Sequence, residues 1–485
     1  MKFFFNNSFL LFTIFIGLLL HLVSAYYTIG FYSDDEHFQI LEITAYLLGL
    51  NEIAINDPTG HYWEWQDNTR MRPWIQPFIF YHFINFLKLF LVDDPFMWTL
   101  IIRVCLSLIG YLSLIYLFFT LKNIFIIKNY KFSYIVFFTF WFYPFLHSRT
   151  SSENLGLTLF IFSFCILFRC IINSKGNFNI YRFSFASFLM GIAMAIKFTL
   201  VFTALPFFFW VVIYRFDFFK IFIFGFFIII ALFLGLYIDY LHWGDFSNTY
   251  YQFYKHNLSS GTLGRMKYFG IEPWYFYITE SIKQLAPVLS IFFILGIIFY
   301  WLKNPKSIIS WITFTTLIIF SFIGHKEIRY IFPIYFFAPF FIIFFFNYFE
   351  IKYFSTFLKF LVIFSNVLFL SFTLFFPPNT KVGVYEYLYK NLNREESVYF
   401  AGENPYLINN MEPFFYTKFI SKIEKIEKNS ETLKKKWIVT NDYQYLDYFL
   451  RRDCELLYST YPRSIINLNE NWRRLKLNWN VIYCK

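Results

Sequence analysis

Charged residues are scarce in this chain of 485 residues: Asp, Glu, Lys and Arg make up 15% of it, whereas they make up about a quarter of an average soluble domain. Hydrophobic residues make up 58%, and they are gathered into long runs. Such runs distinguish a membrane-spanning chain from a soluble domain with a large core. The composition therefore excludes an ordinary soluble protein and predicts an α-helical polytopic membrane protein.

Cysteine is rare, and the five cysteines form neither a CxxC pair nor the spacing of a zinc site. Cys105, Cys165 and Cys170 lie in apolar runs, where cysteine acts as a small buried hydrophobe. Cys454 and Cys484 lie in the polar C-terminal region and can pair if that region faces an oxidising compartment. We expect no metal and no other cofactor.

A basic stripe with interleaved aromatic residues is also lacking, although the net charge is +11. This excludes nucleic acid as a partner. Lys and Arg are concentrated in short loops between apolar runs, which is how membrane proteins hold loops in the cytoplasm. Attraction to an anionic lipid carrier is a second interpretation of the same charge. The lipid bilayer is the first expected partner.

The apolar runs predict about 11 transmembrane helices. With the N-terminus inside, all five predicted cytoplasmic connectors carry Lys or Arg. The first run also resembles a signal peptide, but we favour an uncleaved span because many spans follow. A further run, 74–92, is broken by proline and polar residues and is expected to be interfacial or re-entrant. The expected spans are 8–28, 96–121, 133–147, 155–173, 183–196, 199–214, 219–241, 285–302, 308–323, 330–349 and 357–376.

Two domains are expected. Residues 1–377 form the transmembrane domain, with outer loops at 29–95 and 242–284. Residues 378–485 are more polar and are expected to form a small α/β domain outside the cytoplasm. No internal repeat is present. The elements expected in this domain are strands at 397–401, 437–439 and 481–483 and a helix at 443–452.

The first outer loop carries consecutive carboxylates at Asp34, Asp35 and Glu36, followed by Gln39. A solvated loop tip is the simplest explanation of such a run. Alternatively, one of these carboxylates takes a proton from an acceptor hydroxyl, as glycosyl transfer requires. Crowding and partial desolvation would raise its pKa toward a useful range.

Six polar residues, Arg149 to Asn154, separate two apolar runs, which is more than a tight turn requires. A helix cap explains Ser151 or Ser152, but it does not explain Arg149, Glu153 or Asn154. In the outer loop 242–284, glycines would let the backbone approach a ligand, and Trp274 would stack on a sugar ring.

The string GHKEIRYIFP places four ionisable residues between two apolar spans. A solvated connector is the alternative to a functional site. The cations would suit a phosphate leaving group, with the carboxylate orienting one of them. The four residues are His325, Lys326, Glu327 and Arg329.

These strings together resemble the family 22 glycosyltransferases of the C superfamily, which include the GPI-anchor and dolichol-linked-oligosaccharide mannosyltransferases and bacterial relatives. HKEIRYIFP is similar to the family's His-Lys-Glu-Glu-Arg-Phe and Pro signature, with Ile328 at the second Glu. Asp35-Glu36 with Gln39 is similar to its Pro-Asp-Glu element, with Asp34 at the Pro. RTSSEN, PWYFY and IKFT, which contains Lys197, are similar to three further elements.

The resemblance implies a mannosyltransferase that transfers mannose, with inversion, from a polyprenyl or dolichyl phosphate mannose donor to a glycolipid or oligosaccharide acceptor. It implies that Asp35 is the base and Glu36 its helper, on the non-cytoplasmic face of an endoplasmic reticulum or bacterial inner membrane. The residues expected to bind the donor phosphate are His325, Lys326, Arg329 and Arg149. Those expected to bind substrate are Gln39, Glu153, Asn154, Lys197, Trp274 and Glu327.

Three alternatives remain open on sequence grounds. Another C-superfamily enzyme would use a different polyprenyl-phosphate sugar. A transporter or flippase would place ionisable residues near the bilayer midplane and often shows internal repeats, whereas here the charges lie at span ends. A structural assembly subunit would keep its activity when the first-loop acid is changed.

Overall fold

The computed structural model describes residues 2–51, 62–66, 69–90, 92–122, 128–172, 179–257, 270–349, 352–393, 396–420, 422–426, 435–469, 472 and 476–485. The chain divides into two compact units, each built from several segments. The first contains Met1–Tyr26, Glu64–Gln76 and Ile102–Phe375. The second contains Tyr27–Trp63, Pro77–Ile101 and Phe376–Lys485. The domain boundary after residue 377 stays a prediction, because the second unit also takes in two N-terminal segments.

Within the described residues, five helices are long and apolar enough to cross a membrane, or six if one bent pair counts as a single span. These lengths confirm the predicted class of a helical polytopic membrane protein. The five helices are α1 (Lys2–Tyr27), α5 (Pro95–Leu121), α8 (Ser152–Ile172), α11 (Phe218–Trp243) and α19 (Lys352–Phe375).

Shorter apolar helices account for most of the remaining predicted runs. They are α9 (Ile180–Ile196), η3 (Phe198–Leu200) with α10 (Val201–Tyr214), α15 (Pro287–Lys303) and α16 (Ile308–Phe322). The bent pair joins η5 (Ile328–Ile331) and α17 (Phe332–Tyr335) to α18 (Ala338–Tyr348) at an angle of 53°. The run 74–92 contains the helix α4 (Ile75–Lys88), and its interfacial position stays a prediction.

The run 133–147, expected to be one span, is broken into α6 (Tyr130–Phe138) and α7 (Phe142–His147). Asn366 of α19 pairs with the backbone at the break. Its side chain accepts from the Trp141 N–H at 3.0 Å and donates to the Thr139 carbonyl at 2.8 Å. An apolar environment requires such pairing, because no water is present to satisfy freed backbone groups.

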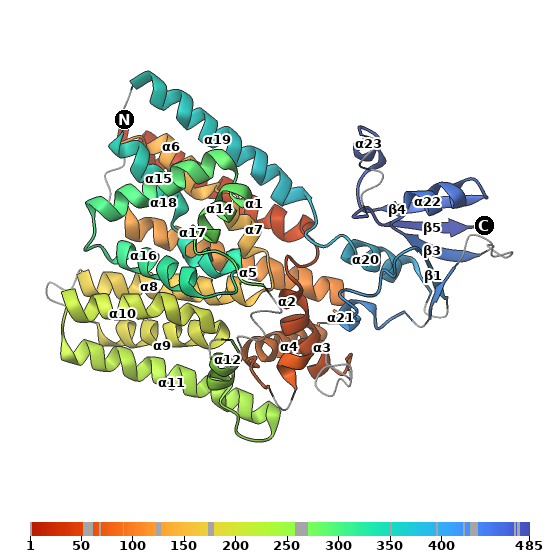
Figure 1. Ribbon diagram of the computed structural model, residues 1–485, viewed down its shortest axis with the longest axis horizontal. Coiled ribbons are helices and arrows are strands. Elements are labelled where there is room, and N and C mark those ends of the chain that lie inside the picture. Colours follow the sequence, from red (N-terminus) through yellow and green to blue (C-terminus); the bar gives the residue numbers. More distant parts are fainter. Residues whose placement is uncertain are drawn as a thin grey trace. The chain divides into compact units, whose positions relative to one another are not determined.

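The helices of the first unit pack closely where glycine faces a neighbour. Helix α9 lies between α8 and α11, and α15 packs on α18 (Figure 1). A Cβ added at Gly191 of α9 would lie 2.6 Å from the Ala231 Cβ of α11. One added at Gly296 of α15 would lie 2.2 Å from the Phe341 carbonyl oxygen of α18. Small residues are used in this way where membrane helices approach each other.

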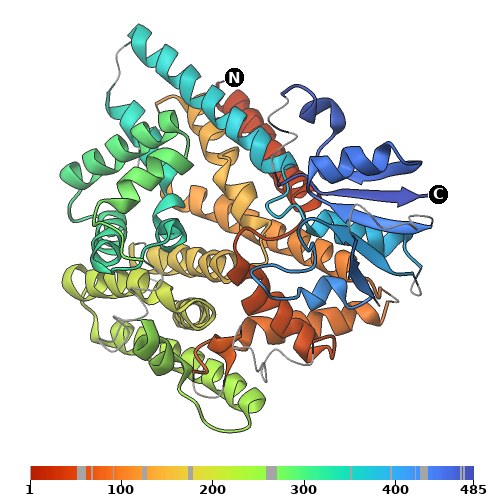
Figure 2. The ribbon, with the colours of Figure 1, turned by 45° about the vertical axis from the view of Figure 1, so that its right-hand side comes forward.

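The C-terminal region contains a five-stranded mixed sheet in the order β2-β1-β3-β5-β4. Its strands are among the blue arrows of Figure 2. The first three strands in this order are parallel, and β5 pairs antiparallel with both β3 and β4. The expected strands at 397–401, 437–439 and 481–483 are confirmed, as is the expected helix at 443–452, which is α22 (Tyr443–Leu450). The strands are β1 (Val398–Ala401), β2 (Ile423–Lys425), β3 (Lys436–Thr440), β4 (Cys454–Ser459) and β5 (Asn480–Cys484).

The remaining described helices are short. Several connect the spans, and others belong to the second unit. They are α2 (Asp34–Glu36), the π-helix η1 (His37–Leu41), α3 (Glu42–Leu47), η2 (Trp63–Trp65), α12 (Thr249–Asn257), α14 (Phe276–Gln284), α20 (Val382–Asn391), α21 (Phe414–Thr417) and α23 (Arg463–Ile466).

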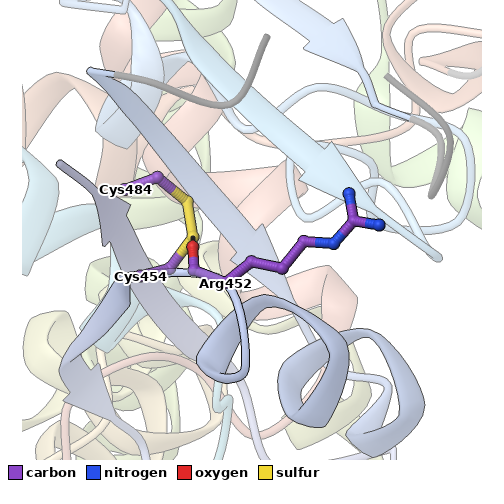
Figure 3. Close-up of a disulfide and its surroundings, with 3 residues drawn as sticks. All are labelled: Arg452, Cys454 and Cys484. Carbon is purple, nitrogen blue, oxygen red and sulfur yellow. Dashed lines mark hydrogen bonds between the residues drawn. A yellow bond between two sulfur atoms is a disulfide. The ribbon is translucent and has the colours of Figure 1, made fainter. Parts of the chain in front are cut away.

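A disulfide joins Cys454, at the start of β4, to Cys484, at the end of β5 (Figure 3). The two residues are register partners in the sheet, so the covalent bond lies across an existing strand pair. It closes a loop with a sequence separation of 30 residues, which contains the whole of the β4–β5 hairpin. Cys105, Cys165 and Cys170 are free.

We predict that Cys454→Ala with Cys484→Ala destabilises the C-terminal sheet. A loop of this length removes chain entropy from the unfolded state worth about 3–4 kcal/mol. Limited proteolysis of the full chain, followed by mass mapping of the cuts, should show faster cleavage within 398–484. Cys170→Ala is the control and should leave the cleavage rate unchanged; equal rates in all three proteins would contradict the prediction.

Candidate active site

Glu327 organises the loop between α16 and η5. Its Oε1 lies 3.2 Å from the His325 Nε2 and accepts from the Tyr330 hydroxyl at 3.3 Å. Its Oε2 accepts from the Arg329 Nε. One carboxylate therefore contacts an imidazole, a guanidinium and a phenol from the same short segment, which holds their positions relative to one another.

Arg329 also reaches a second carboxylate, Glu153, in the first turn of α8. Its Nη1 lies 3.6 Å from the Glu153 Oε1, and the same oxygen accepts from the Lys197 Nζ at 2.5 Å. The side chains of Glu153, Arg329 and Lys197 are 8%, 10% and 12% exposed. Charges so nearly buried require partners, and each has one here. We call Glu153, Lys197, His325, Glu327 and Arg329 the charged cluster.

The charges on His325 and Glu327 stabilise each other. The hydrogen bond to Glu327 raises the pKa of His325, against the opposing effect of burial. Burial alone would raise the pKa of Glu327, but the hydrogen bond from His325 and the charge of Arg329 hold that pKa well below its usual value. The imidazolium form of His325 is therefore more stable here than it would be in a free imidazole.

Lys326 points toward backbone rather than toward the carboxylates. Its Nζ donates to the carbonyls of Glu272 at 2.8 Å and Ile323 at 2.5 Å. The Glu272 N–H in turn donates to the Gly324 carbonyl at 3.0 Å. Burial lowers the pKa of Lys326. The ammonium thus links the segment around Glu272, within the predicted outer loop 242–284, to the loop between α16 and η5. Its contact with the donor phosphate stays a prediction.

The turn before α8 is held by Asn154, which is fully buried. Its amide donates to the carbonyls of His147 at 2.9 Å and Arg149 at 2.7 Å. The His147 Nδ1 lies 2.9 Å from the His21 Nε2 of α1. Arg149 is 2% exposed, and its Nη2 donates to the Ser148 hydroxyl at 3.1 Å. Asn154 therefore positions the backbone of the turn that carries Arg149.

Trp274 lies in the turn before α14 and is 68% exposed, with its ring centroid 5.7 Å from that of Tyr275. An exposed ring is available for stacking on a sugar, which stays a prediction. Gly261 and Gly264 of the same predicted loop lie outside the described residues.

The first-loop carboxylates belong to the second unit and differ in their surroundings. Glu36 is 2% exposed and accepts from the Tyr32 N–H at 2.9 Å. Asp34 accepts from the Asn409 side chain. Asp35 is half-buried, and Gln39, in the π-helix η1, is buried. Single π-helical turns occur frequently at functional sites.

Sequence reasoning missed a buried contact between a histidine and a glutamate just after these carboxylates. The His37 Nε2 lies 2.8 Å from the Glu42 Oε1, and both side chains are fully buried. Glu42 also accepts from the Phe415 N–H at 3.0 Å and the Asn51 amide at 2.9 Å. The spacing of five residues between His37 and Glu42 carries no sequence signal, because the π-helical turn determines which side chains meet.

Asp239, near the end of α11, was also missed. It is 1% exposed and accepts from the Trp74 N–H at 2.8 Å and the Thr249 hydroxyl at 2.6 Å. A lone Asp within an apolar run of 26 residues is the signal that could have found it, because such residues are rare and partnered. Here it joins the segment before α4 to α11.

The fold is that of a known class of membrane protein. The chain is similar to ArnT from Cupriavidus metallidurans bound to undecaprenyl phosphate, with a TM-score of 0.56 and 9% identity over 98% of both chains. The apo form of the same protein gives a TM-score of 0.55 and 10% identity over the same shares. The architecture is therefore an ArnT-like helical membrane fold with a small C-terminal sheet.

The chain belongs to the Alg9-like mannosyltransferase family, whose model matches residues 10–409. It is 25% identical to mannosyltransferase APTG1 of Arabidopsis thaliana over 63% of this chain and 53% of that protein. It is 26% identical to GPI alpha-1,2-mannosyltransferase 3 of Bos taurus over 62% and 52%. The chain spans about half the length of these curated relatives. The predicted family is confirmed.

We predict that Lys197→Met lowers stability by about 3 kcal/mol, because it removes a partner from the buried carboxylate of Glu153. The double variant Glu153→Gln with Lys197→Met should recover most of this loss, since no uncompensated carboxylate remains. Thermal unfolding of the purified chain in lipid nanodiscs measures both. Additive losses in the double variant would show that the two residues act independently.

Proposed function

We propose that this chain transfers mannose from a polyprenyl phosphate mannose, such as the dolichyl form, to a hydroxyl of a glycolipid or oligosaccharide acceptor, with inversion at C1. The bond between C1 and the phosphate oxygen breaks, and a bond between C1 and the acceptor oxygen forms. The acceptor proton goes to a carboxylate, and polyprenyl phosphate leaves as an anion. Membership of the Alg9-like mannosyltransferase family supports the choice of sugar.

The charged cluster carries the proposal. It combines two carboxylates, Glu153 and Glu327, with Lys197, Arg329 and a His325 whose pKa is raised by its contact with Glu327. Arg149 and Lys326 add two more cations in the adjoining turns, so positive charge is in excess. Preorganised cations of this kind stabilise the charge that develops on a departing phosphate, without the need to protonate it. Arg329 is the main candidate, because a guanidinium binds phosphate in a bidentate manner.

Asp35 is the proposed base. It is half-buried and directly precedes Glu36, which is buried. The assignment is supported by its place in the Asp35-Glu36 string with Gln39, which resembles the family's first-loop element. Glu36 is the proposed helper. Gln39 and Trp274 are proposed to contact substrate, as are Asn154 and the two carboxylates of the charged cluster.

We place the reaction on the non-cytoplasmic face of a bacterial inner membrane or of the endoplasmic reticulum. The basic connectors of the opposite face support this orientation. A disulfide in the C-terminal sheet supports an oxidising compartment for that region. Involvement in GPI-anchor biosynthesis is one form of the proposal, and another polyprenyl-phosphate sugar is the alternative within the same fold.

The deciding experiment is transfer of radiolabelled mannose from a short-chain polyprenyl phosphate mannose by the purified chain, with lipid extracts as acceptors. A labelled acceptor lipid is expected. Movement of the intact donor across the bilayer without a new labelled product would identify a flippase. Transfer from a different sugar donor alone would replace mannose but keep the enzyme class.

In that assay, Asp35→Asn should lower kcat about 100-fold or more, because it removes the proton acceptor. Asp34→Asn is the matched control, and its kcat should stay within about threefold of the wild-type value. Asp34 is given no part in proton transfer, because its carboxylate accepts a hydrogen bond from the Asn409 side chain. Thermal unfolding should be unchanged in Asp35→Asn. Near-normal turnover of that variant would remove Asp35 from the role of base.

Arg329→Lys should raise the KM for the donor about tenfold while leaving the acceptor KM unchanged, because an ammonium cannot make two parallel bonds to phosphate. Lys326→Ala should act chiefly through stability, since its ammonium contacts backbone carbonyls. An unchanged donor KM in Arg329→Lys would refute the phosphate-site proposal.

The rate of donor use should fall as the pH rises through the raised pKa of His325, because imidazolium is the form that stabilises phosphate. Glu327→Gln removes the charge that raises this pKa, so the decline should begin at a lower pH. The measurement is the profile of kcat/KM for the donor against pH. A decline that shifts to higher pH in Glu327→Gln would contradict the assignment.

A further inference from the structure

A cavity of about 270 Å³ lies within the C-terminal sheet region, entirely in the second unit. It is bounded by α22, by strand ends of the sheet, and by the segments at 466–467 and 478. This volume lies just below the usual range for small-molecule sites of about 300–1,000 Å³. The cavity therefore has room for a small molecule built on a single six-membered ring, but not for a helix or a large ligand.

The sheet register brings polar residues from three strands to this cavity. Asn480, at the start of β5, pairs with Thr440 at the end of β3 and with Ser459 at the end of β4. Asn441 directly follows β3. Three of these residues, Asn480, Ser459 and Asn441, line the cavity. Ligands bind outside the carboxyl ends of strands in many open α/β sheets, and both β3 and β4 end here.

The opposite wall is one face of α22. Tyr443, Leu446, Asp447 and Leu450 all line the cavity, and their spacing of three and four residues places them on the same side of the helix. The face offers two apolar side chains, a phenol and a carboxylate. Asp447 is exposed, so its carboxylate is accessible from the cavity mouth.

The amides at the base are held by a network of hydrogen bonds. Asn478 accepts from the Ser459 hydroxyl at 3.1 Å, and its amide donates to Asn480 at 3.3 Å. Asn441 donates to Glu403 at 2.8 Å. Side chains fixed in this way keep their positions when a ligand arrives, which lowers the entropic cost of binding.

We propose that this cavity is a binding site for one hexose unit of a neutral glycan. A hexose presents several hydroxyls, each a donor and an acceptor, and a face of C–H groups. Amide oxygens and the Asp447 carboxylate can accept hydrogen bonds from such hydroxyls. Leu446, Leu450 and the Tyr443 ring provide an apolar surface for the C–H face.

Other ligand classes fit less well. No Lys, Arg or His is present among the lining residues that the structure describes, which disfavours a phosphate or another anion. The described lining has a single carboxylate, which disfavours a divalent cation. A lipid chain would remove water from the exposed Asp447 carboxylate without offering it a hydrogen-bond donor.

The identity of the glycan rests on the proposed function: the natural ligand is then a sugar of the acceptor, held at a distance from the reacting hydroxyl. The saccharide site itself does not depend on catalysis. Binding without donor therefore tests the site, and the acceptor KM tests the link to transfer.

The test is saturation-transfer-difference NMR of the full chain in lipid nanodiscs, with methyl α-D-mannopyranoside and the corresponding glucoside and galactoside as probes. At least one glycoside should bind. Asp447→Asn should weaken this binding about tenfold, which corresponds to the loss of one charge-assisted hydrogen bond. Asn467→Trp, an exposed lining position, should abolish it by filling the cavity.

Two controls separate this site from the active site. Glu455→Gln neutralises an exposed carboxylate of β4 that does not line the cavity, and it should bind as the wild type does. Asp35→Asn should also retain binding, whether or not transfer occurs. If no glycoside binds, or if Asp447→Asn and Asn467→Trp both bind normally, the saccharide site is overturned.

In the transfer assay, the same two variants should raise the KM for the acceptor at least fivefold with kcat and donor KM unchanged. A normal acceptor KM together with lost glycoside binding would keep the saccharide site but overturn its assignment to the acceptor.

Discussion

The Glu153 carboxylate, shared between Lys197 and Arg329, is the contact on which the rest of the first unit's chemistry depends. Ionised groups in an apolar surrounding are stable only when each is paired, because desolvation is costly. The three residues come from the start of α8, the end of α9 and η5. The pairing therefore holds these three helix ends together. Because one carboxylate is shared by two cations, the three side chains also carry a net positive charge.

The second constraint is that backbone N–H and C=O groups in an apolar environment must be paired. The apolar helices of this unit are interrupted at 139–141 and at the loop between α16 and η5, and each interruption leaves backbone groups that need another partner. Asn366 and Asn154 pair with such groups through their amides, and Lys326 does so through its ammonium. Breaks of this kind are tolerated because polar side chains supply the missing partners, either from a distant helix, as Asn366 does, or from the same turn, as Asn154 does. They allow polar residues to lie at span ends with defined geometry.

The C-terminal sheet was predictable only in part. The strands at 398–401, 436–440 and 480–484 were predictable from short β-branched and aromatic runs. The short β2 was not, because three residues carry no pattern. The β4 strand was missed because its residues CELLYS do not alternate cleanly between apolar and polar. The register that collects Asn480, Ser459 and Asn441 at one edge follows from strand pairing, which no local pattern specifies.

The sequence by itself determined the membrane class, the positions of the apolar runs, the family and the polar strings at Asp34–Glu36, Arg149–Asn154 and His325–Arg329, because hydropathy and local motifs are encoded in neighbouring residues. Only the tertiary structure decided that Glu153 pairs with Lys197, that Lys326 turns to backbone carbonyls, and that Glu42 and Asp239 are buried with partners. Those outcomes depend on side chains far apart in the chain, and pairing across such distances is set by how the helices pack.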